Sequence, residues 1–183
     1  MSATTLAQLI EILQTRGHAR YDGEEVSQLQ HALQTATLAL NEDAPASLVA
    51  AALFHDIGHL VHDLGEHASA QGQDDRHEYR ALGWLKPAFD ADVWEPVHLH
   101  VEAKRYLCNV DAGYIEQLSA ESVASLALQG GPMDAGGTRA FAAKPHAQNA
   151  VRLRRWDDAA KDVNAQTPSL AYFADYLKPI AKR

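Results

Sequence analysis

Residues 48–59 read LVAAALFHDIGH, an apolar run that ends in a His-Asp pair. A helix over 48–54 would be apolar on nearly every side, so we expect it to lie buried in the middle of the fold, with Ser47 as its N-cap. It would carry His55 and Asp56 into the interior. An imidazole and a carboxylate are costly in apolar surroundings unless a charged group satisfies them, as a metal cation does. The alternative is that the pair only caps or hydrogen-bonds the neighbouring backbone.

Helical periodicity dominates the rest of the sequence. Apolar residues recur every three or four positions over 6–13 and 26–36, and Gly17 and Gly23 bracket the loop between these two helices. Further helices are expected over 75–86 (before Pro87), 93–104, 119–129, 144–161 and 169–177, and loops over 65–75 and the glycine-rich 130–137. No strand alternation or interdomain linker is present. The sequence therefore predicts an all-α fold, a single helical domain over residues 1–183.

The composition excludes several classes of protein. The 183 residues carry 24 acidic and 16 basic side chains, a net charge of -8, which is opposite to what a nucleic-acid binder carries. No run approaches the roughly 20 apolar residues of a membrane span, and no signal-like segment begins the sequence. Cys108 is the single cysteine, which excludes an internal disulfide and a multi-cysteine zinc site. We expect a cytoplasmic protein without nucleic-acid or membrane partners.

Ten histidines are a more informative excess, because imidazole is the common metal ligand in proteins. His31 lies on the amphipathic helix before the His55-Asp56 pair, and Asp157 lies on a late helix. This order of His, then His-Asp, then Asp resembles the HD superfamily, a set of helical metalloproteins of which most are phosphohydrolases. The resemblance implies that these four residues bind a metal.

Two more histidines indicate a second metal. In one branch of that superfamily, two histidines between the HD pair and the final Asp make the site dinuclear, and His77 and His100 occupy suitable positions. Asp56 would then be the bridging carboxylate. Four imidazoles and two carboxylates suit iron or manganese better than a thiolate-seeking ion, and two irons are the first choice. The six predicted ligands are His31, His55, Asp56, His77, His100 and Asp157.

The other histidines carry weaker signals. His59, one turn after His55, projects from the same helical face, so we expect it to orient a ligand or to touch the substrate. The solvated histidines are expected to be His18, His67 and His146, and no role is assigned to His62, His98 or Cys108.

Longer motifs narrow the resemblance from the HD superfamily to one family within it. They are Tyr21 with Glu24, SQLQH (27–31), HDIGH (55–59), His100 with Lys104, LQGGPM (128–133) and RLRRWD (152–157). Together they extend over most of the chain, up to about Lys161, and resemble the HD-domain mixed-valent diiron phosphonate oxygenases, which cleave a carbon–phosphorus bond oxidatively. The resemblance implies an Fe(II)/Fe(III) pair, dioxygen as co-substrate, and a small 1-hydroxyphosphonate that chelates one iron.

Four side chains can bind the phosphonate group. Lys104 lies one turn after one predicted ligand and Arg154 three residues before another, so both cations would face the metal-bound anion. Ser122 and Ser125, three apart on one helix, can donate hydroxyl hydrogen bonds to its oxygens. The alternative for each of the four is an ordinary surface position.

Tyr21 and Glu24 precede the first ligand in a glycine-containing loop. The resemblance implies that they form a lid, in which the cationic nitrogen of the substrate displaces the tyrosine and meets the glutamate, leaving an iron site free for dioxygen. A hydrogen bond within a surface loop is the alternative.

The expected substrate is (R)-2-amino-1-hydroxyethylphosphonate, yielding glycine and phosphate, or its N-trimethyl analogue, yielding glycine betaine. A primary ammonium needs acceptors such as Glu24, whereas a quaternary ammonium needs aromatic faces, for which Tyr21, Tyr79, Trp84 and Trp156 are candidates. The sequence leaves this choice and the oligomeric state open. Two other functions also stay open: an HD-superfamily phosphohydrolase acting on a small phosphate ester through metal-bound water, and a ligand-sensing domain without catalysis.

Overall fold

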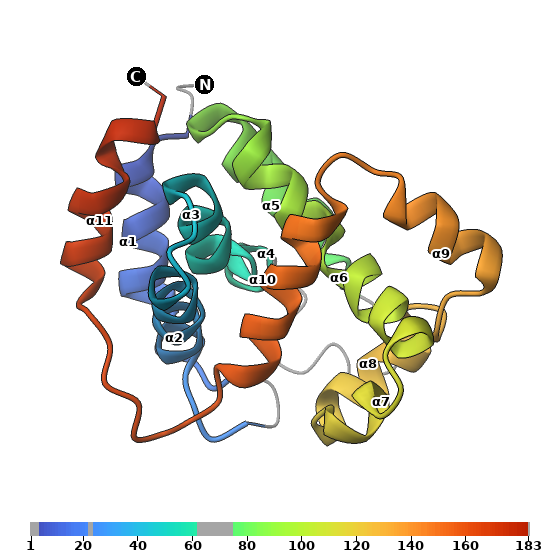
Figure 1. Ribbon diagram of the computed structural model, residues 1–183. Helices are drawn as coiled ribbons and strands as arrows, with labels where there is room; N and C mark the ends of the chain where they lie inside the picture. Colours follow the sequence, from blue (N-terminus) through green and yellow to red (C-terminus); the bar gives the residue numbers. More distant parts are fainter. Residues whose placement is uncertain (1–3, 22–23, 62–74, 183) are drawn as a thin grey trace.

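The chain folds into helices, as its periodicity predicts. The computed structural model describes residues 4–21, 24–61 and 75–182, and within these ranges the chain forms helices and no β-sheet, with one isolated bridge between Arg20 and Ser27. The helices are α1 Leu6–Arg16, α2 Gln28–Asn41, α3 Ala46–Phe54, α4 Ile57–Leu60, α5 His77–Ala88, α6 Ala91–Val110, α7 Tyr114–Gln117, α8 Ala120–Leu128, α9 Ala135–Ala142, α10 Ala147–Ala159 and α11 Leu170–Leu177, followed by the 3-10 turn η1 Lys178–Ile180 (Figure 1).

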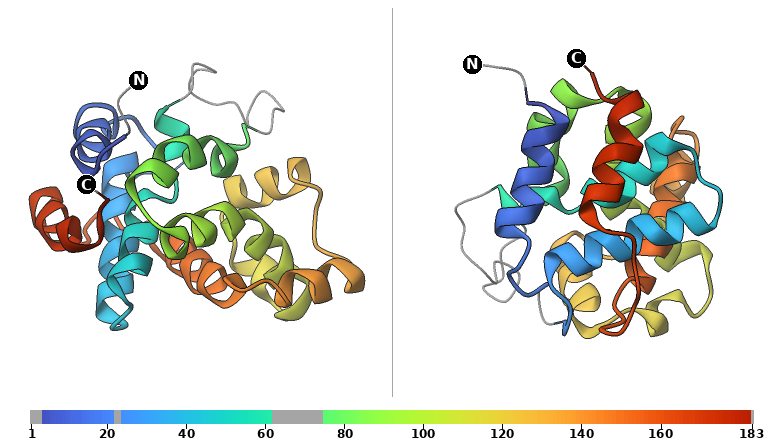
Figure 2. Two further views of the ribbon diagram at one scale, coloured as in Figure 1. Left: turned by 90° about the horizontal axis from the view of Figure 1, so that it is seen from above. Right: turned by 90° about the vertical axis from the view of Figure 1, so that its left-hand side faces the viewer.

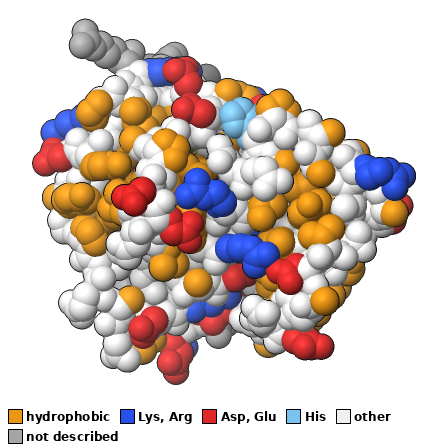
Figure 3. Space-filling model, in the orientation of Figure 1, with side chains coloured by type: hydrophobic (Ala, Val, Ile, Leu, Met, Phe, Trp, Pro, Cys, Tyr) orange, Lys and Arg blue, Asp and Glu red, His pale blue; other side chains and the backbone are white. Residues whose placement is uncertain are grey.

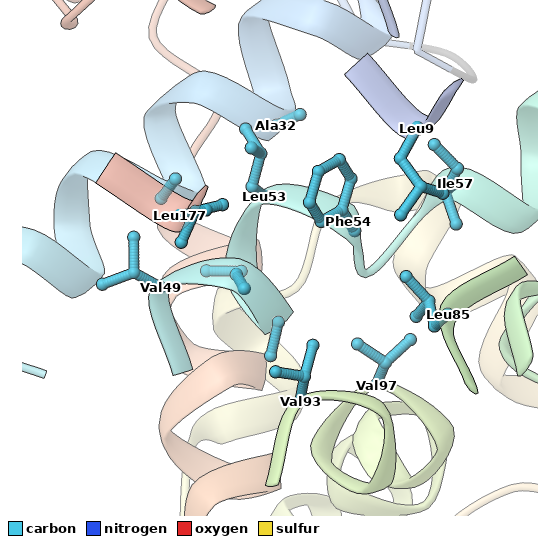
Figure 4. Close-up of a cluster of buried hydrophobic side chains, with 14 of the residues drawn as sticks. Leu9, Ala32, Val49, Leu53, Phe54, Ile57, Leu85, Val93, Val97 and Leu177 are labelled. Carbon is cyan, nitrogen blue, oxygen red and sulfur yellow. The ribbon is translucent and has the colours of Figure 1, made fainter. Parts of the chain in front are cut away.

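Helix α3 forms the centre of the fold. All its residues from Leu48 to Phe54 are buried, and apolar side chains from α1, α2, α5, α6 and α11 surround it (Figure 4). Burying a Leu or Phe side chain contributes about 1.5–3 kcal/mol, so this run supplies a large share of the hydrophobic stabilisation. The helix ends at Phe54, and the C-cap residue that follows it, His55, is 0% exposed. The core therefore fixes the position of the His-Asp pair.

The other helices enclose this centre on two sides. Helices α1 and α11 lie side by side on one side, and α7, α8 and α9 lie on the opposite side, beyond α6 (Figures 1 and 2). Between them, α2, α3, α6 and α10 pack against one another, and α5 packs against α6. The predicted ligands come from these inner helices.

One predicted helix cap and one predicted loop need correction. Ser47 is not the N-cap of α3, because Pro45 holds that position and the helix begins at Ala46; the fixed φ of proline suits the entry to a helix. The stretch 130–137 is not all loop, since α9 begins at Ala135. Asp134 accepts a hydrogen bond from the backbone N–H of Gly137 at 2.7 Å, and this cap offsets the poor helix propensity of glycine in the first turn.

Other predicted boundaries shift by a few residues. Pro87 does not end α5, which runs to Ala88, because a proline in the last turn removes only one backbone hydrogen bond. Helix α6 is longer than expected and α10 shorter. The loop predicted over 65–75 lies outside the described residues except for Asp75. The same holds for His62 and for His67, which belongs to that loop.

The surface carries charges of both signs. On the face shown in Figure 3, acidic and basic side chains lie close together rather than in separate patches of one sign. Among the described helices, none combines the length and the apolar character that a membrane span requires.

Candidate metal centre

Four of the predicted ligands form a buried cluster. His31 comes from α2, His55 and Asp56 follow α3, and Asp157 comes from α10. Nε2 of His31 lies 3.1 Å from Nε2 of His55 and 3.3 Å from Oδ1 of Asp157. Nε2 of His55 lies 3.2 Å from Oδ2 of Asp56. One ligand atom from each residue lies within 4.8 Å of the others, so these four side chains can hold one metal ion.

A second cluster shares Asp56 with the first. The Nε2 atoms of His77, on α5, and His100, on α6, are 3.0 Å apart and lie 3.5 and 3.7 Å from Oδ1 of Asp56. Nε2 of His59 lies 3.8 Å from the same oxygen, and Asp56, His59 and His77 offer a further group of ligand atoms. Because Oδ2 of Asp56 faces the first cluster and Oδ1 the second, this carboxylate has the geometry of a bridge between two ions.

In each of the four histidines, the hydrogen bond at Nδ1 determines whether Nε2 carries a proton or a lone pair. Nδ1 lies 2.9 Å from a backbone carbonyl oxygen in His31 and in His55, and 2.6 Å from one in His100. In His77, Nδ1 lies 3.0 Å from Oδ1 of Asp75. Each acceptor needs an N–H donor, so Nε2 of a neutral ring presents a lone pair to the cluster. Two nitrogen ligands about 2.1 Å from one ion and at right angles are about 3.0 Å apart, so the observed spacing fits a shared cation.

The carboxylates point to the same conclusion. Oδ2 of Asp56 and Oδ1 of Asp157 are buried and have no hydrogen-bond partner among the described residues. Burial raises the pKa of both carboxyls. The charge of His55 nevertheless brings the pKa of Asp56 well below its ordinary value, and the charge of Arg154 does the same for the pKa of Asp157. A buried anion of this kind requires a cation. Burial lowers the pKa of His55, but the carboxylates of Asp56 and Asp157 together raise it to about 10, so in the absence of a metal a proton on His55 offsets part of this negative charge.

Asp75 joins His59 to His77, a role that the sequence analysis missed. Its Oδ2 lies 2.6 Å from Nδ1 of His59 and its Oδ1 lies 3.0 Å from Nδ1 of His77. The two imidazoles stack, with ring centroids 4.0 Å apart. Burial raises the pKa of the Asp75 carboxyl, but hydrogen bonds from His59 and His77 lower it far below its ordinary value. The available signal was an acidic residue two positions before a predicted ligand, at the end of a stretch that reads as a surface loop.

A small cavity adjoins the two clusters. Its volume is about 70 Å³, which suits a ligand of few atoms. All predicted site residues line it except His31 and His55, which are fully buried. The lining residues that were not predicted from the sequence are Gln28, Asp75, Val101, Glu121, Leu128, Gln129 and Lys161.

Lys104 and two serines meet at the cavity. Nζ of Lys104 donates to Oγ of Ser125 at 2.8 Å and to the backbone carbonyl oxygen of Ser122 at 3.4 Å. Lys104 is 2% exposed, and burial, followed by the charge of Arg154, lowers its pKa to about 7. A phosphonate bound here would find hydroxyl donors and, below that pKa, a positive charge.

Arg154 is held by a network that the sequence analysis also missed. Its Nη1 lies 2.7 Å from Oδ2 of Asp157, while Nε and Nη2 bond to the carboxylate of Asp158, which also accepts a hydrogen bond from the Tyr114 hydroxyl. Burial lowers the pKa of the guanidinium, but Asp157 and Asp158 raise it well above its ordinary value. Arg154 therefore links the first metal cluster to the cavity that it lines.

Tyr21 and Glu24 both line the cavity, and each has a partner there. The ring of Tyr21 stacks on that of His31, with centroids 4.0 Å apart. Burial, and then the charge of Asp157, raises the pKa of Tyr21 well above its ordinary value, so its hydroxyl stays protonated. Oε1 of Glu24 lies 2.8 Å from Nζ of Lys161. Lys161 lies four residues after the RLRRWD motif (152–157), and no local sequence pattern identified it as a site residue.

The remaining aromatic candidates lie elsewhere. Trp84 and Trp156 belong to the main apolar core, and Tyr79 is 46% exposed under the guanidinium of Arg76. Among the described residues that line the cavity, Tyr21 is the only Phe, Tyr or Trp. His18, His98, His146 and Cys108 are not among the lining residues either.

Comparison with known proteins gives two informative relatives. No family model matches the chain. The hydroxymethylphosphonate dioxygenase of Gimesia maris is 44% identical to it over 168 residues, which cover 90% of this chain and 82% of the relative. The glycine-betaine-forming 1-hydroxy-2-(trimethylamino)ethylphosphonate dioxygenase of Leisingera caerulea is 37% identical over 167 residues, which cover 91% of this chain and 85% of the relative. Both similarities extend over nearly the whole chain rather than over one motif.

Proposed function

The chain belongs to the family of hydroxyphosphonate dioxygenases, and on this basis we propose that it cleaves the carbon–phosphorus bond of a small 1-hydroxyphosphonate with dioxygen, in the cytoplasm. The products would be inorganic phosphate and a carboxylate. With hydroxymethylphosphonate, one dioxygen would convert one substrate into one formate and one phosphate with release of a proton, so that atoms and electrons balance.

The observation that carries this proposal is the pair of clusters that share Asp56. His31, His55 and Asp157 would hold one ion with Oδ2 of Asp56, and His77 and His100 would hold a second with Oδ1. Nitrogen and oxygen ligands of this kind suit iron, and two irons of mixed valence in an HD domain are our proposal for the cofactor. When bound, they supply the redox chemistry and the Lewis acidity that the reaction needs.

The residues around the cavity would bind and orient the phosphonate. Lys104 offers an ammonium group, and the hydroxyls of Ser122 and Ser125 lie beside it. Arg154 adds a charge that Asp157 and Asp158 hold in place. These groups place positive charge where the substrate carries negative charge, and they would hold the phosphonate next to the metal pair.

Tyr21 and His59 complete the surroundings of the metals. Tyr21 covers the ring of His31, and its burial supports a role in keeping water from that side of the cluster. His59, fixed by Asp75 and stacked on His77, would hold the ring of His77 in position.

Reconstitution of the protein with different metals tests the proposal. Protein freed of metal would be loaded anaerobically with Fe(II), Mn(II) or Zn(II), and its metal content counted. Each form would then receive hydroxymethylphosphonate, 2-amino-1-hydroxyethylphosphonate or the trimethyl analogue, with and without dioxygen. We expect two irons per chain and phosphate release that needs both iron and dioxygen. Each form would also receive a small phosphate ester, and hydrolysis of that ester by the Mn(II) or Zn(II) form without dioxygen would instead support a phosphohydrolase.

A further inference from the structure

Lys161 occupies a distinctive position in the cavity. It follows Ala160, the C-cap residue of α10, and its side chain is 16% exposed. Its Nζ lies 2.8 Å from Oε1 of Glu24 and 2.9 Å from Oγ of Ser119, and 5.8 Å from the centre of the Tyr21 ring. The ammonium of Lys161 is therefore held by three groups from three separate parts of the chain.

Two of these groups are the ones that a nitrogen-bearing substrate would need. A primary ammonium needs a carboxylate acceptor such as Glu24, and a quaternary ammonium needs an aromatic face such as Tyr21. Lys161 already provides a cation to both. Burial raises the pKa of Glu24, but the hydrogen bond from Lys161 lowers it below its ordinary value, so the two form a charged pair.

A cationic substrate would meet a like charge at this place. The Glu24–Lys161 pair is neutral as a whole, and the carboxylates of Asp157 and Asp158 are engaged with Arg154. Glu121 also lines the cavity, but it lies in the first turn of α8, where the helix N-terminus stabilises its charge. An added ammonium would have to displace Lys161 or lie beside it.

We propose that Lys161 is a specificity-determining residue: it fills the position that a substrate nitrogen would occupy, so the enzyme selects a hydroxyphosphonate without a cationic substituent. Hydroxymethylphosphonate is the smallest such compound. This inference rests on the proposed function.

Competition among three substrates tests the inference. We would measure kcat/KM of the iron-loaded protein for hydroxymethylphosphonate, 2-amino-1-hydroxyethylphosphonate and its trimethyl analogue. The wild type is expected to favour hydroxymethylphosphonate by about tenfold or more over both cationic compounds. Lys161→Met frees Glu24 and should lower that ratio by about tenfold, whereas Lys161→Arg, which keeps the charge, should preserve it.

Three further variants serve as controls. Lys178→Met removes an exposed lysine that pairs with Asp175, far along the chain from the cavity residues, and should leave all three rates unchanged. Glu24→Gln removes the negative charge that a substrate ammonium needs as well as the ion pair with Lys161, so it should not improve turnover of the amino substrate. Glu121→Gln should leave the preference as it is, because Glu121 is not the proposed discriminator.

The outcomes separate this inference from the proposed function. If the wild type converts no hydroxyphosphonate, the proposed function fails. If it converts the amino or trimethyl substrate as well as hydroxymethylphosphonate, or if that conversion depends on Glu121, the role of Lys161 is wrong and the proposed function stands. A wild type without the preference overturns the role of Lys161 even if the Lys161→Met protein does not fold, and Lys161→Arg then tests whether the charge sustains the preference.

Discussion

A Cβ atom added to Gly58 would lie 2.0 Å from the backbone carbonyl oxygen of His77, far closer than any normal contact. The glycine in the HDIGH motif therefore allows the start of α5 to pack directly against α4, which brings His77 to Asp56. The contact explains why this position has no side chain.

Gly58→Ala should displace the start of α5 and destabilise the protein by about 2 kcal/mol, as overpacking does in a buried site. It should also reduce the binding of the second metal, because His77 moves. Gly83→Ala is the matched control: nothing lies within 4 Å of its added Cβ, and it should stabilise α5 by a few tenths of a kcal/mol to about 1 kcal/mol. Urea unfolding and metal analysis would check both; a Gly58→Ala protein with two metals and wild-type stability contradicts the prediction.

Asp75→Asn should weaken the second metal position more than the first. The carboxylate fixes His77 and His59, and removing such a partner typically lowers metal affinity by about 10–100-fold. The first cluster relies on backbone acceptors for His31 and His55, so it should keep its ion. Metal titration followed by spectroscopy would distinguish the two positions. Equal loss of both ions, or of neither, would argue against separate support of the two clusters.

The pKa of Lys104, lowered to about 7, predicts a pH dependence of substrate capture. Below pH 7 the ammonium is charged and binds the phosphonate; above it the amine is neutral. We therefore expect kcat/KM to fall as pH rises above about 7, by up to about tenfold per unit. Lys104→Arg, which stays charged, should abolish this fall. A wild-type profile that is flat between pH 7 and 9, or an arginine variant that falls in parallel, would refute the assignment.

Asp158 and Tyr114 should affect substrate affinity through Arg154. Asp158→Ala removes two bonds to the guanidinium, so Arg154 should be less well positioned and KM should rise by about tenfold, the equivalent of 1.4 kcal/mol, with a smaller change in kcat. Tyr114→Phe removes the bond to Asp158 and a longer one from Nε of Arg154, but it leaves the Asp158 carboxylate on the guanidinium, so it should have a weaker effect. Steady-state kinetics with a thermal unfolding control would test this. A loss confined to kcat would mean that Arg154 acts on the chemistry rather than on binding.

Sequence reasoning predicted the parts of the fold that a local pattern encodes, such as the apolar run of α3, which predicted a buried helix. The six ligand candidates came from the resemblance to the HD superfamily; the fold brings their side chains close together, and their role as ligands stays a prediction. No such guide was available for other contacts between residues far apart in the sequence. Glu24 and Lys161 are separated by 137 positions and Tyr114 and Asp158 by 44, and no local pattern records either pairing.

Cap chemistry explains another error. The glycines after position 130 favour a loop, but one side-chain acceptor, Asp134, is enough to start α9 among them. A propensity summed over a short window does not include a single hydrogen bond of this kind.

We propose that this protein uses dioxygen at a pair of irons to break a carbon–phosphorus bond. Dioxygen uptake and phosphate release, followed together in one sealed vessel with iron-loaded protein and hydroxymethylphosphonate, test it most directly. We expect one dioxygen consumed per phosphate released, and no phosphate under nitrogen. Phosphate release that continues without dioxygen, or dioxygen uptake without phosphate, would contradict it.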